Sequence, residues 1–356
     1  MLQLFDSTAV LSGEGVLVYG RVTGPDGNEV QEMPTIVGAE SPRSGAAVAH
    51  EVVWSEDRPD FALRLATPAP FSLRWADAQG REHTELVQPR LAFEAPHLAL
   101  NQPKRPREER LAVSTMTLGD EDRLEEWVRY HTELGATDFL LFHNHRAPSA
   151  VLESLAPQGV SVVSFPFSAA EGEHWNNVQR GALNIGAAAL REKVAFIAFI
   201  DVDEFIGVPN NGSLLDLMRH AGSAQLKGSV LTNLGRRDAV QNNVLTLADR
   251  FCEEASPKIV LATADLLSVP FVRSPHEHPV AAPLTEHKAK LFHMWLNERC
   301  SCAPDALRVR LDRRTHWQET LNAPHRRGRA SLFTVIVIVA ILLVAAAFAL
   351  VARKVA

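Results

Sequence analysis

The sequence has few cysteines, no excess of positive charge and no amino-terminal leader pattern. Three cysteines among 356 residues are too few for a disulfide framework, and the single residue between Cys300 and Cys302 is poor spacing for a structural zinc site. We therefore expect ordinary thiols in a reducing compartment. A formal net charge of −6 gives no basic footprint for nucleic acid, so we expect no nucleic-acid partner. Met1 to Asp6 has neither a basic n-region nor a long apolar stretch, which predicts no cleavable signal peptide.

One long apolar run stands near the end of the chain. Leu332 to Val351 contains no charged residue, and its length matches the roughly 20 residues needed to cross a bilayer core. A fully buried core helix is the weaker alternative. Basic residues flank the run, with more of them on the amino-terminal side, at Arg326 to Arg329. The excess of positive charge on that side predicts a single-pass membrane protein with a carboxyl-terminal anchor and most of the chain in the cytoplasm.

Residues 1–100 alternate short apolar stretches with turn signals. Gly15 to Gly20, for example, is followed by the turn-rich stretch Gly24 to Asn28. This pattern predicts a small all-β, sandwich-like domain. Trp54 and Trp75 suit either a sugar-stacking platform or the core of that domain, and a core role is the more common one. Residues 101–110 are polar, charged and broken by proline, which is typical of a linker.

From Leu111 onward, strand-like and helix-like patterns alternate. Apolar runs predict strands at Leu111–Met116, Phe139–Phe142, Val160–Phe165 and Val194–Ile200, and helical spacing of apolar residues predicts helices between them. Repeated strand–helix–strand units favour an α/β fold with a mostly parallel sheet. We place this domain at residues 111–320, although residues 213–320 are less periodic. The apolar run at 332–351 then follows as a separate transmembrane helix.

The strand at Val194–Ile200 ends in a cluster of acidic residues. Asp201, Asp203 and Glu204 follow it within four positions. Open α/β sheets bind ligands at the carboxyl ends of their strands, so these side chains are candidates for a site. Asp201 and Asp203 can both reach one cation, and two oxygen ligands plus substrate phosphates are typical of Mg²⁺ or Mn²⁺. The alternative is a strand end with solvated acids, and the apolar residues on both sides of the cluster favour the site.

Several motifs in order resemble a known enzyme family. Glu125 to Gly135, Gln179 with Asn184, and Phe199 to Phe205 are similar to the "EW-x-x-YH-x-x-x-G" helix and the "Q…D-x-DEF" core of glycosyltransferase family 2-like and family 92 proteins. Lys258, His276 and the stretch Leu291 to Trp295 resemble later landmarks of the family more loosely. The resemblance covers about residues 111–300. It implies a GT-A fold, which is a Rossmann-like sheet that binds a nucleotide-sugar through a divalent cation.

The resemblance also implies roles for individual residues. Asp201 and Asp203 would hold Mn²⁺ or Mg²⁺ against the donor diphosphate, and His293 would complete the metal shell or serve as a packed structural imidazole. Contacts to the nucleotide would come from a set of four residues: Asp120, Asn144, Gln179 and Asp201. The family's inverting mechanism needs a carboxylate base, for which Glu277 and Asp265 are candidates. His276 or His278 could instead lie near the acceptor.

The sequence departs from the family pattern at two places that concern the donor pocket. Leu118, Gly119 and Asp120 stand where the family often has Lys-Asn-Glu, and Asp120 keeps a carboxylate that could meet the nucleobase. His143 stands where the family often has the first Asp of "DN-x-S-x-D". We expect a membrane-anchored, metal-dependent, inverting glycosyltransferase that moves a sugar from a nucleotide-sugar donor to a glycan or lipid-linked acceptor. The departure at His143 favours an alternative, a non-catalytic protein that binds glycan or a partner on the same scaffold. A metal-dependent phosphohydrolase ranks third, because it would need a richer cluster of carboxylates and histidines.

Overall fold

The structure of this protein is a computed structural model, and the account below concerns the residues that it describes. These are residues 2–13, 15–23, 33–55, 60–102, 105–119, 121–146, 149–168, 175–209, 212–232, 250–267, 271–285 and 288–295. Asp120 and the apolar run at 332–351 lie outside these ranges. Within them, the helices are all too short or too polar to cross a membrane. The membrane anchor therefore stays a prediction.

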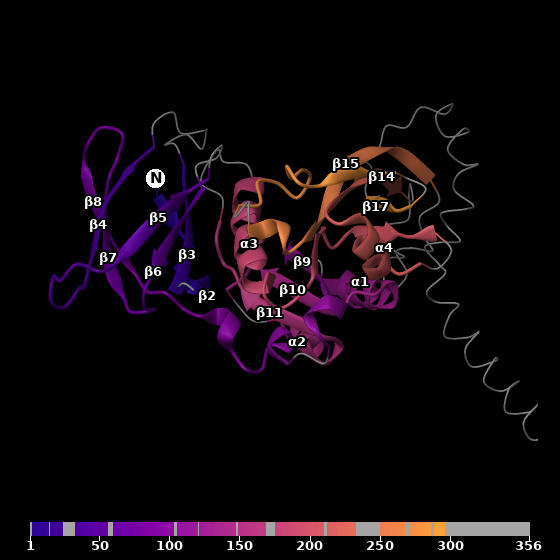
Figure 1. Cartoon of the computed structure of the whole chain (residues 1–356), viewed down its shortest axis with the longest axis horizontal. Helices are drawn as coiled ribbons and strands as arrows, with labels where there is room; N and C mark the ends of the chain where they lie inside the picture. The colour runs from indigo at the N-terminus through magenta and orange to yellow at the C-terminus, as the bar shows by residue number, and fades with distance from the viewer. Residues whose placement is uncertain are drawn as a thin grey trace, which may run out of the picture.

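The amino-terminal part is a β-sandwich, drawn in indigo and violet in Figure 1. Its larger sheet is antiparallel and contains β1 (Leu2–Leu4), β2 (Val10–Ser12), β3 (Gly15–Val22), β5 (His50–Trp54) and β6 (Asp60–Leu65). Its smaller antiparallel sheet contains β4 (Thr35–Glu40), β7 (Phe71–Ala76) and β8 (Glu82–Val87). Val18 and Phe61 from the larger sheet share one buried core with Phe71 and Leu73 from the smaller sheet. The two sheets thus bury one face each against the other.

The two sandwich tryptophans that suited either a sugar platform or the core are packed against the core. The Trp54 ring lies 4.9 Å from the ring of Phe61, and the Trp75 ring stacks on His83 with centroids 4.3 Å apart. Both side chains are partly buried against the sandwich core. This packing agrees with the core role.

The segment expected as a linker is docked onto the following domain. It follows η3 (Ala99–Asn101) and contains η4 (Arg107–Glu109), both single turns of 3₁₀-helix. Arg107 donates hydrogen bonds to the carbonyl of Val194 at 3.2 Å and to Thr263 Oγ1 at 2.8 Å. Arg110 forms a buried ion pair with Asp138, with Nη2 2.5 Å from Oδ1. Arg107 and Arg110 therefore fix residues 107–110 to the α/β part.

The α/β part is built on one nine-stranded sheet. Its strands are β9 (Leu111–Thr117), β10 (Asp138–His143), β11 (Val160–Ser164), β12 (Phe196–Phe199), β13 (Glu204–Gly207), β14 (Ala224–Thr232), β15 (Arg250–Ala262), β16 (Ala282–Leu284) and β17 (Lys290–Trp295). Their order is β11-β10-β9-β12-β15-β14-β17-β13, with β16 beside β14. The first four strands are parallel, as the sequence predicted.

The second half of the sheet differs from the prediction of a mostly parallel sheet. β15 runs antiparallel to both β12 and β14, and β13 runs antiparallel to β17, so the sheet is mixed. Parallel neighbours need a long crossover connection, usually a helix. After the short helix at Leu214–Ala221, the sequence has little of the helical periodicity that such crossovers require, and this is the part of the sheet where strands reverse direction.

Helices cover both faces of the sheet. α1 (Glu121–Leu134), α2 (Ala150–Ser154) and α4 (Leu214–Ala221) share one core with alternate strand residues such as Val113 and Leu141. α3 (Asn176–Leu190) shares the other core with the strand residues that point to the opposite face of the sheet, such as Leu140 and Phe142. This second core also includes residues of the sandwich, so α3 lies between the sandwich and the sheet (Figure 1).

Candidate active site

The acidic cluster lies at the carboxyl end of β12, in the middle of the sheet. β12 pairs in parallel with β9, with Phe199 opposite Ser114, so the loop after β12 and the end of β9 at Thr117 lie at the same edge. The residues of β12 are fully buried, with Ile197 and Phe199 in the core with α3 and Ala198 in the core with α1. Asp201 is thus the first acidic group after a strand that is covered on both faces.

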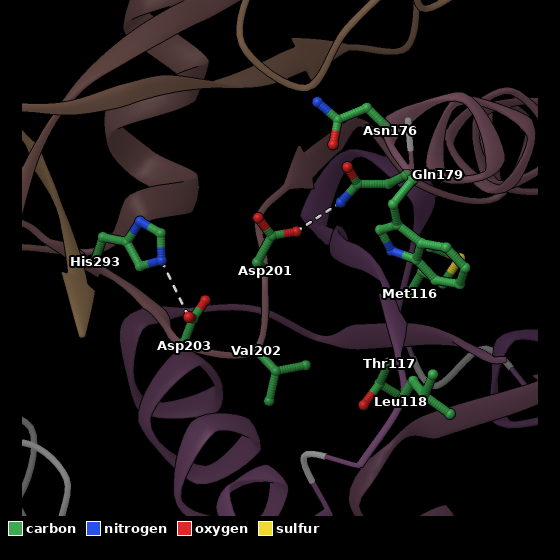
Figure 2. A pocket seen from close by; sticks show the side chains of 10 residues that line it. Met116, Thr117, Leu118, Asn176, Gln179, Asp201, Val202, Asp203 and His293 are labelled. Carbon is green, nitrogen blue, oxygen red and sulfur yellow. Dashed lines mark hydrogen bonds and ion pairs between the residues drawn. The ribbon is translucent and has the colours of Figure 1, made fainter. Parts of the chain in front are cut away.

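A pocket of about 480 Å³ opens at this edge (Figure 2). Asp201, Asp203 and His293 line one side of it. Met116, Leu118 and the exposed part of Trp175 add apolar surface, with Leu118 52% and Trp175 38% exposed. The remaining lining residues are Thr117, Asn176, Gln179 and Val202. The pocket therefore combines an acidic side with an apolar side, as a ligand that is charged at one end and flat and apolar at the other would require.

Asp201 is held by hydrogen bonds on both of its carboxylate oxygens. Gln179 Nε2 donates to Oδ1 at 2.7 Å, and Lys258 Nζ lies 2.5 Å from Oδ2 (Figure 2 shows the first contact). Lys258 also lies 3.3 Å from Glu204 Oε2, and Glu204 accepts a hydrogen bond from the backbone N–H of Asp201 at 2.8 Å. Lys258 and Glu204 are almost fully buried. These contacts fix the backbone of the loop that carries Asp203.

The charges of this cluster depend on one another. Burial raises the pKa of Asp201, but the neighbouring Lys258 ammonium outweighs this and holds the pKa below its ordinary value. Burial raises the pKa of Glu204 to about 7 despite the opposing effect of Lys258. Burial lowers the pKa of Lys258, but Glu204 and Asp201 together raise it above its ordinary value. Lys258 therefore stays charged and stabilises the carboxylate form of Asp201.

Asp203 and His293 form a second pair that faces the pocket. β17 pairs with β13 so that His293 lies opposite Glu204, and this register brings His293 Nε2 to 3.0 Å from Asp203 Oδ2. Burial lowers the pKa of His293, but the hydrogen bond to Asp203 and the surrounding carboxylates raise it above its ordinary value. Both side chains are partly exposed, at 19% and 29%. Both side chains line the pocket, and the other ring nitrogen of His293, Nδ1, lies 3.7 Å from Glu204 Oε1.

These two groups fit a divalent cation in part. In the described residues, no three or more His, Cys, Asp or Glu side chains come together as a ready metal site. Mg²⁺, however, is usually bound by one or two carboxylates with substrate phosphates and water completing its shell, and Mn²⁺ accepts imidazole as well. Asp203 and His293 could supply such a partial set, whereas both oxygens of Asp201 already accept hydrogen bonds.

Helix α1, whose sequence resembles the "EW-x-x-YH" motif, holds the strand that follows the acidic cluster. Trp127 Nε1 donates to the carbonyl of Glu204 at 2.9 Å, and Tyr130 Oη donates to the carbonyl of Ile206 at 2.9 Å. His131 accepts from the N–H of Ile206 through Nε2 at 3.4 Å and donates from Nδ1 to the carbonyl of Trp127 at 2.9 Å. Burial lowers the pKa of His131 to about 4, so the ring is neutral. The motif therefore clamps β13, which begins directly after Asp203.

Of the four residues predicted to contact a nucleotide, only some line the pocket. Gln179 and Asp201 line the pocket together. Asn144 follows β10, where its amide Nδ2 donates to the carbonyls of Phe165 and Phe167 at 2.8 and 2.7 Å, and it is not among the lining residues. Asp120 lies outside the described residues. The structure thus brings together two of the four.

The two candidate bases have different surroundings. Asp265 follows Ala262, which pairs with Phe196 at the start of β12, and it accepts a hydrogen bond from Ser223 at 2.5 Å. This end of β12 is the one away from Asp201. Glu277 is exposed and adjoins His276, whose Nδ1 donates to the carbonyl of Pro257 at 2.8 Å. Glu277 is not among the lining residues of the pocket, and its nearest placed neighbour is His276.

The two histidines proposed near the acceptor separate in the same way. His276 lies close enough to Lys258 and Asp201 for their charges to act on it, and burial together with Lys258 lowers its pKa. His278 is buried near Arg273 and Asp265, at the other edge, and burial lowers its pKa as well. Of the two, His276 is the one beside the pocket residues.

Four further residues at the site were given no role from the sequence: Thr117, Trp175, Asn176 and Lys258. Thr117 is buried, and its hydroxyl has no hydrogen-bond partner among the described residues although it lines the pocket. Its place at the end of the strand beside β12 is a signal that the rule of carboxyl strand ends could have used. Lys258 could not be found in this way, since its contact with Asp201 depends on an antiparallel pairing that the pattern did not predict.

The fold and the pocket can be compared with known proteins. Residues 109–236 match the family model of glycosyltransferase family 92. The matched segment runs from β9 through α1 and β12 into β14, so it includes Asp201, Asp203 and the motif of α1. A glycosyltransferase family 92 protein of rice (Oryza sativa subsp. japonica) is 25% identical over 134 residues, which are 37% of this chain and 22% of that protein. The chain thus spans about a fifth of the length of this family 92 relative.

Two solved structures resemble part of this chain, with low sequence identity. The match to a crystal structure of S. aureus TarS 1-349 covers 52% of this chain and 60% of the TarS chain. The sequence identity is 13% and the TM-score is 0.32. The match to a structure of S. aureus TarS 1-349 in complex with UDP covers 45% of this chain and 48% of the TarS chain. The sequence identity is 16% and the TM-score is 0.28.

Proposed function

We propose that this protein is a metal-dependent glycosyltransferase that moves a sugar from a nucleotide-sugar donor to a glycan or lipid-linked acceptor. The observation that carries the proposal is the pocket at the carboxyl ends of β9 and β12, where Asp203 and His293 face a space with an apolar opposite side. The match of residues 109–236 to glycosyltransferase family 92, and the similar segment of the rice protein, support the same activity.

In this proposal, the donor lies across the pocket with its diphosphate toward Asp203 and His293. The hydroxyl of Thr117 and the amide of Asn176 would bind polar groups of the nucleoside or sugar, and the apolar side at Leu118 and Trp175 would cover its flat surface. Gln179 donates a hydrogen bond to Asp201, and this bond holds the start of α3 next to the loop after β12. Roles of Asp120 and Asn144 in nucleotide binding stay predictions.

The cation, Mn²⁺ or Mg²⁺, would be held by Asp203 and His293, with Asp201 close by. When bound, it supplies positive charge that stabilises the departing nucleoside diphosphate. The protein's own contribution is to keep Asp203 in place through the contacts of Glu204 and Lys258. Because Lys258 neutralises Asp201, the pocket presents less negative charge to the donor diphosphate than the three clustered acids alone would.

An inverting displacement needs a base at the acceptor hydroxyl, on the face of the sugar away from the leaving group. We assign this role to Glu277, because its neighbour His276 lies close enough to Asp201 for their charges to interact. Asp265 would have to act from the far edge of the sheet, so we do not assign it this role. The apolar run at 332–351 would anchor the enzyme in a membrane and bring lipid-linked or other membrane acceptors within its reach.

Calorimetric titration of UDP and GDP into the full chain, with and without Mn²⁺, tests donor binding. We expect one of the nucleotides to bind, tighter with Mn²⁺ than without, and the effect of Mn²⁺ to disappear in Asp203→Asn. Asp216→Asn makes the same chemical change at an exposed carboxylate of α4 and is the matched control. If neither nucleotide binds with any divalent cation, the alternative of a glycan- or partner-binding protein gains over the enzyme.

A further inference from the structure

Helix α3, which lines the pocket, also contacts the β-sandwich. The first turns of α3 carry Asn176 and Gln179, which line the pocket, and Trp175 directly precedes them. Successive residues of a helix point about 100° apart, so Arg180 and Gly181, which follow Gln179, point to adjoining faces of the same turn. Both of these residues contact the sandwich.

Arg180 makes an ion pair that joins the two parts of the molecule. Its Nε lies 3.0 Å from Oδ2 of Asp60, the first residue of β6 in the larger sandwich sheet. The two side chains are only 11% and 9% exposed. Breaking a buried pair by removing one partner leaves an uncompensated charge, so the helix and the sheet are strongly coupled at this position.

At Gly181 the backbone of α3 lies directly against the ring of Phe5. A Cβ at this position would lie 2.4 Å from the ring of Phe5, which is 1% exposed. Phe5 also packs on Phe165 and Phe167, with ring centroids 5.2 and 4.8 Å away. A glycine within a helix is intrinsically unfavourable, and here the close contact with a buried ring explains it.

Contacts of the sandwich also reach the chain that follows β11. Arg21 of β3 donates to the carbonyl of Ser168 at 3.3 Å, and its guanidinium lies 5.9 Å from the centre of the Phe5 ring. Arg21 is 1% exposed. The sandwich therefore holds the chain on two sides of the pocket wall, at Ser168 and at the first turns of α3.

We propose that the β-sandwich positions the donor pocket, with Arg180 as the positioning residue that sets the start of α3 and thereby Trp175, Asn176 and Gln179. The sandwich would then be a structural part of the donor site. Displacing the first turn of α3 would move Gln179 away from Asp201 and shift one wall of the pocket. The ligand affected is the nucleoside diphosphate of the proposed function, on which this part of the inference rests.

The test compares four variants of the full chain: Arg180→Met, Arg180→Lys, Gly181→Ala and Arg110→Met. Arg110→Met is the matched control, because it breaks another buried ion pair, with Asp138, at the opposite edge of the sheet from the pocket. Two quantities are measured in each folded variant: the Kd for UDP or GDP, and the ¹⁹F resonance of Trp175 in protein labelled with fluorotryptophan, assigned with Trp175→Phe.

We expect Arg180→Met and Gly181→Ala to raise the Kd about tenfold and to shift the Trp175 resonance. Arg180→Lys keeps the charge and should stay close to the parent protein in both. Arg110→Met should lower the stability but leave the Kd and the resonance unchanged. If Arg180→Met fails to fold, Gly181→Ala decides, and its combination with Phe5→Leu, which makes room for the added methyl group, should restore the parent resonance.

An unchanged Kd together with an unchanged Trp175 resonance in Arg180→Met and Gly181→Ala would overturn the inference and leave these contacts a purely structural role. The resonance separates this failure from that of the proposed function. If the parent protein binds neither UDP nor GDP, the proposed function fails, while a shifted resonance still supports positioning by the sandwich and an unshifted one still refutes it.

Discussion

Asp201 and Asp203 are two positions apart but have different surroundings. The carboxylate of Asp201 accepts hydrogen bonds from Gln179 and Lys258, whereas that of Asp203 faces His293 and the pocket. Asp201 therefore belongs to a buried charge cluster that shapes the loop, and Asp203 is the more available ligand. A pair of acids spaced at i and i+2 at a strand end does not by itself reveal this division of roles.

Replacing Lys258 should destabilise the protein far more than an ordinary lysine replacement. Lys258→Met leaves Asp201 and Glu204 without their buried cation, and breaking a buried pair by removing one partner typically costs about 3–5 kcal/mol. Urea unfolding measures the loss. Lys193→Met is the control, since Lys193 is half-buried and, among the described residues, hydrogen-bonds the neutral amide of Asn101. Equal losses in the two variants would contradict this account of the cluster.

The hydroxyl of Thr117 should matter for donor binding and not for folding. It has no hydrogen-bond partner among the described residues, so Thr117→Val removes no bond within the protein and should leave the stability unchanged or slightly higher. We expect nucleotide affinity to fall by about three- to tenfold, as for the loss of one hydrogen bond. Titration calorimetry and thermal unfolding measure the two effects.

Thr8→Val is the matched control for this substitution. Thr8 is equally buried, but its hydroxyl donates to the carbonyl of Phe5 at 2.9 Å. This variant should lose stability and keep the nucleotide affinity, which is the reverse pattern. The prediction for Thr117 is wrong if both variants behave alike.

At the scale of residues, the sequence predicted the members of the site that lie near each other in the chain or match a motif. Asp201, Asp203 and Gln179 were identified in this way, and His293 was named as a metal ligand or a packed imidazole. Lys258 and Thr117 were not given roles, because their importance depends on which strands become neighbours. A lysine in an apolar strand is compatible with many surroundings, and only the pairing of β15 with β12 places it beside Asp201.

At the scale of elements, α1 and β13 act as a unit. Three side chains of α1 bind backbone groups of β13, and the neutral ring of His131 is one of them. The sequence predicted α1 and the four parallel strands correctly, since their apolar periodicity is strong. It predicted strands that overlap β14 and β15, at Gly228–Leu234 and Lys258–Leu261, but not how the strands from β13 to β17 pair, because that pairing depends on contacts between distant segments.

The burial of His131 should make the protein less stable in mild acid. Its pKa is lowered to about 4 in the folded chain, against about 6.5 when unfolded, so the unfolded state takes up a proton first as the pH falls. The contribution of His131 to stability is therefore present above pH 6.5 and lost progressively between about pH 6.5 and 4, amounting to about 3 kcal/mol.

His131→Gln removes this titration and tests the assignment. The variant should be less stable than the parent protein at pH 7, because the clamp on Ile206 is altered, but its free energy of unfolding should fall less steeply between pH 6.5 and 4.5. Urea unfolding at several pH values gives both slopes. Identical slopes would mean that His131 is not the titrating group.

At the scale of the whole molecule, the sandwich and the α/β part share one core. Phe5, Val10 and Tyr19 of the sandwich lie in the same apolar cluster as α3 and β12. The domain boundary near residue 100 was predicted from composition, but the close packing across it was not. One signal was present, since Gly15 to Gly20 is apolar on both faces, and a strand of that kind is buried on both sides.

The shared core predicts that the two parts unfold together. A chain that begins at residue 101 would expose the apolar face of α3 and leave Arg180 without Asp60, so we expect it to be insoluble or unfolded. In the intact chain, near-ultraviolet circular dichroism and a fluorescence label in the sandwich should report the same urea midpoint. Two separate midpoints, or a soluble folded fragment, would show instead that the parts are independent.

The most direct test of the proposed activity is the release of nucleoside diphosphate from a set of UDP- and GDP-sugars by the full chain, measured with and without Mn²⁺. The account predicts release from at least one donor, dependent on the cation, abolished in Asp203→Asn and retained in Asp216→Asn. Release that is equal in Asp203→Asn and the parent protein, or no release from any donor with any divalent cation, would contradict it.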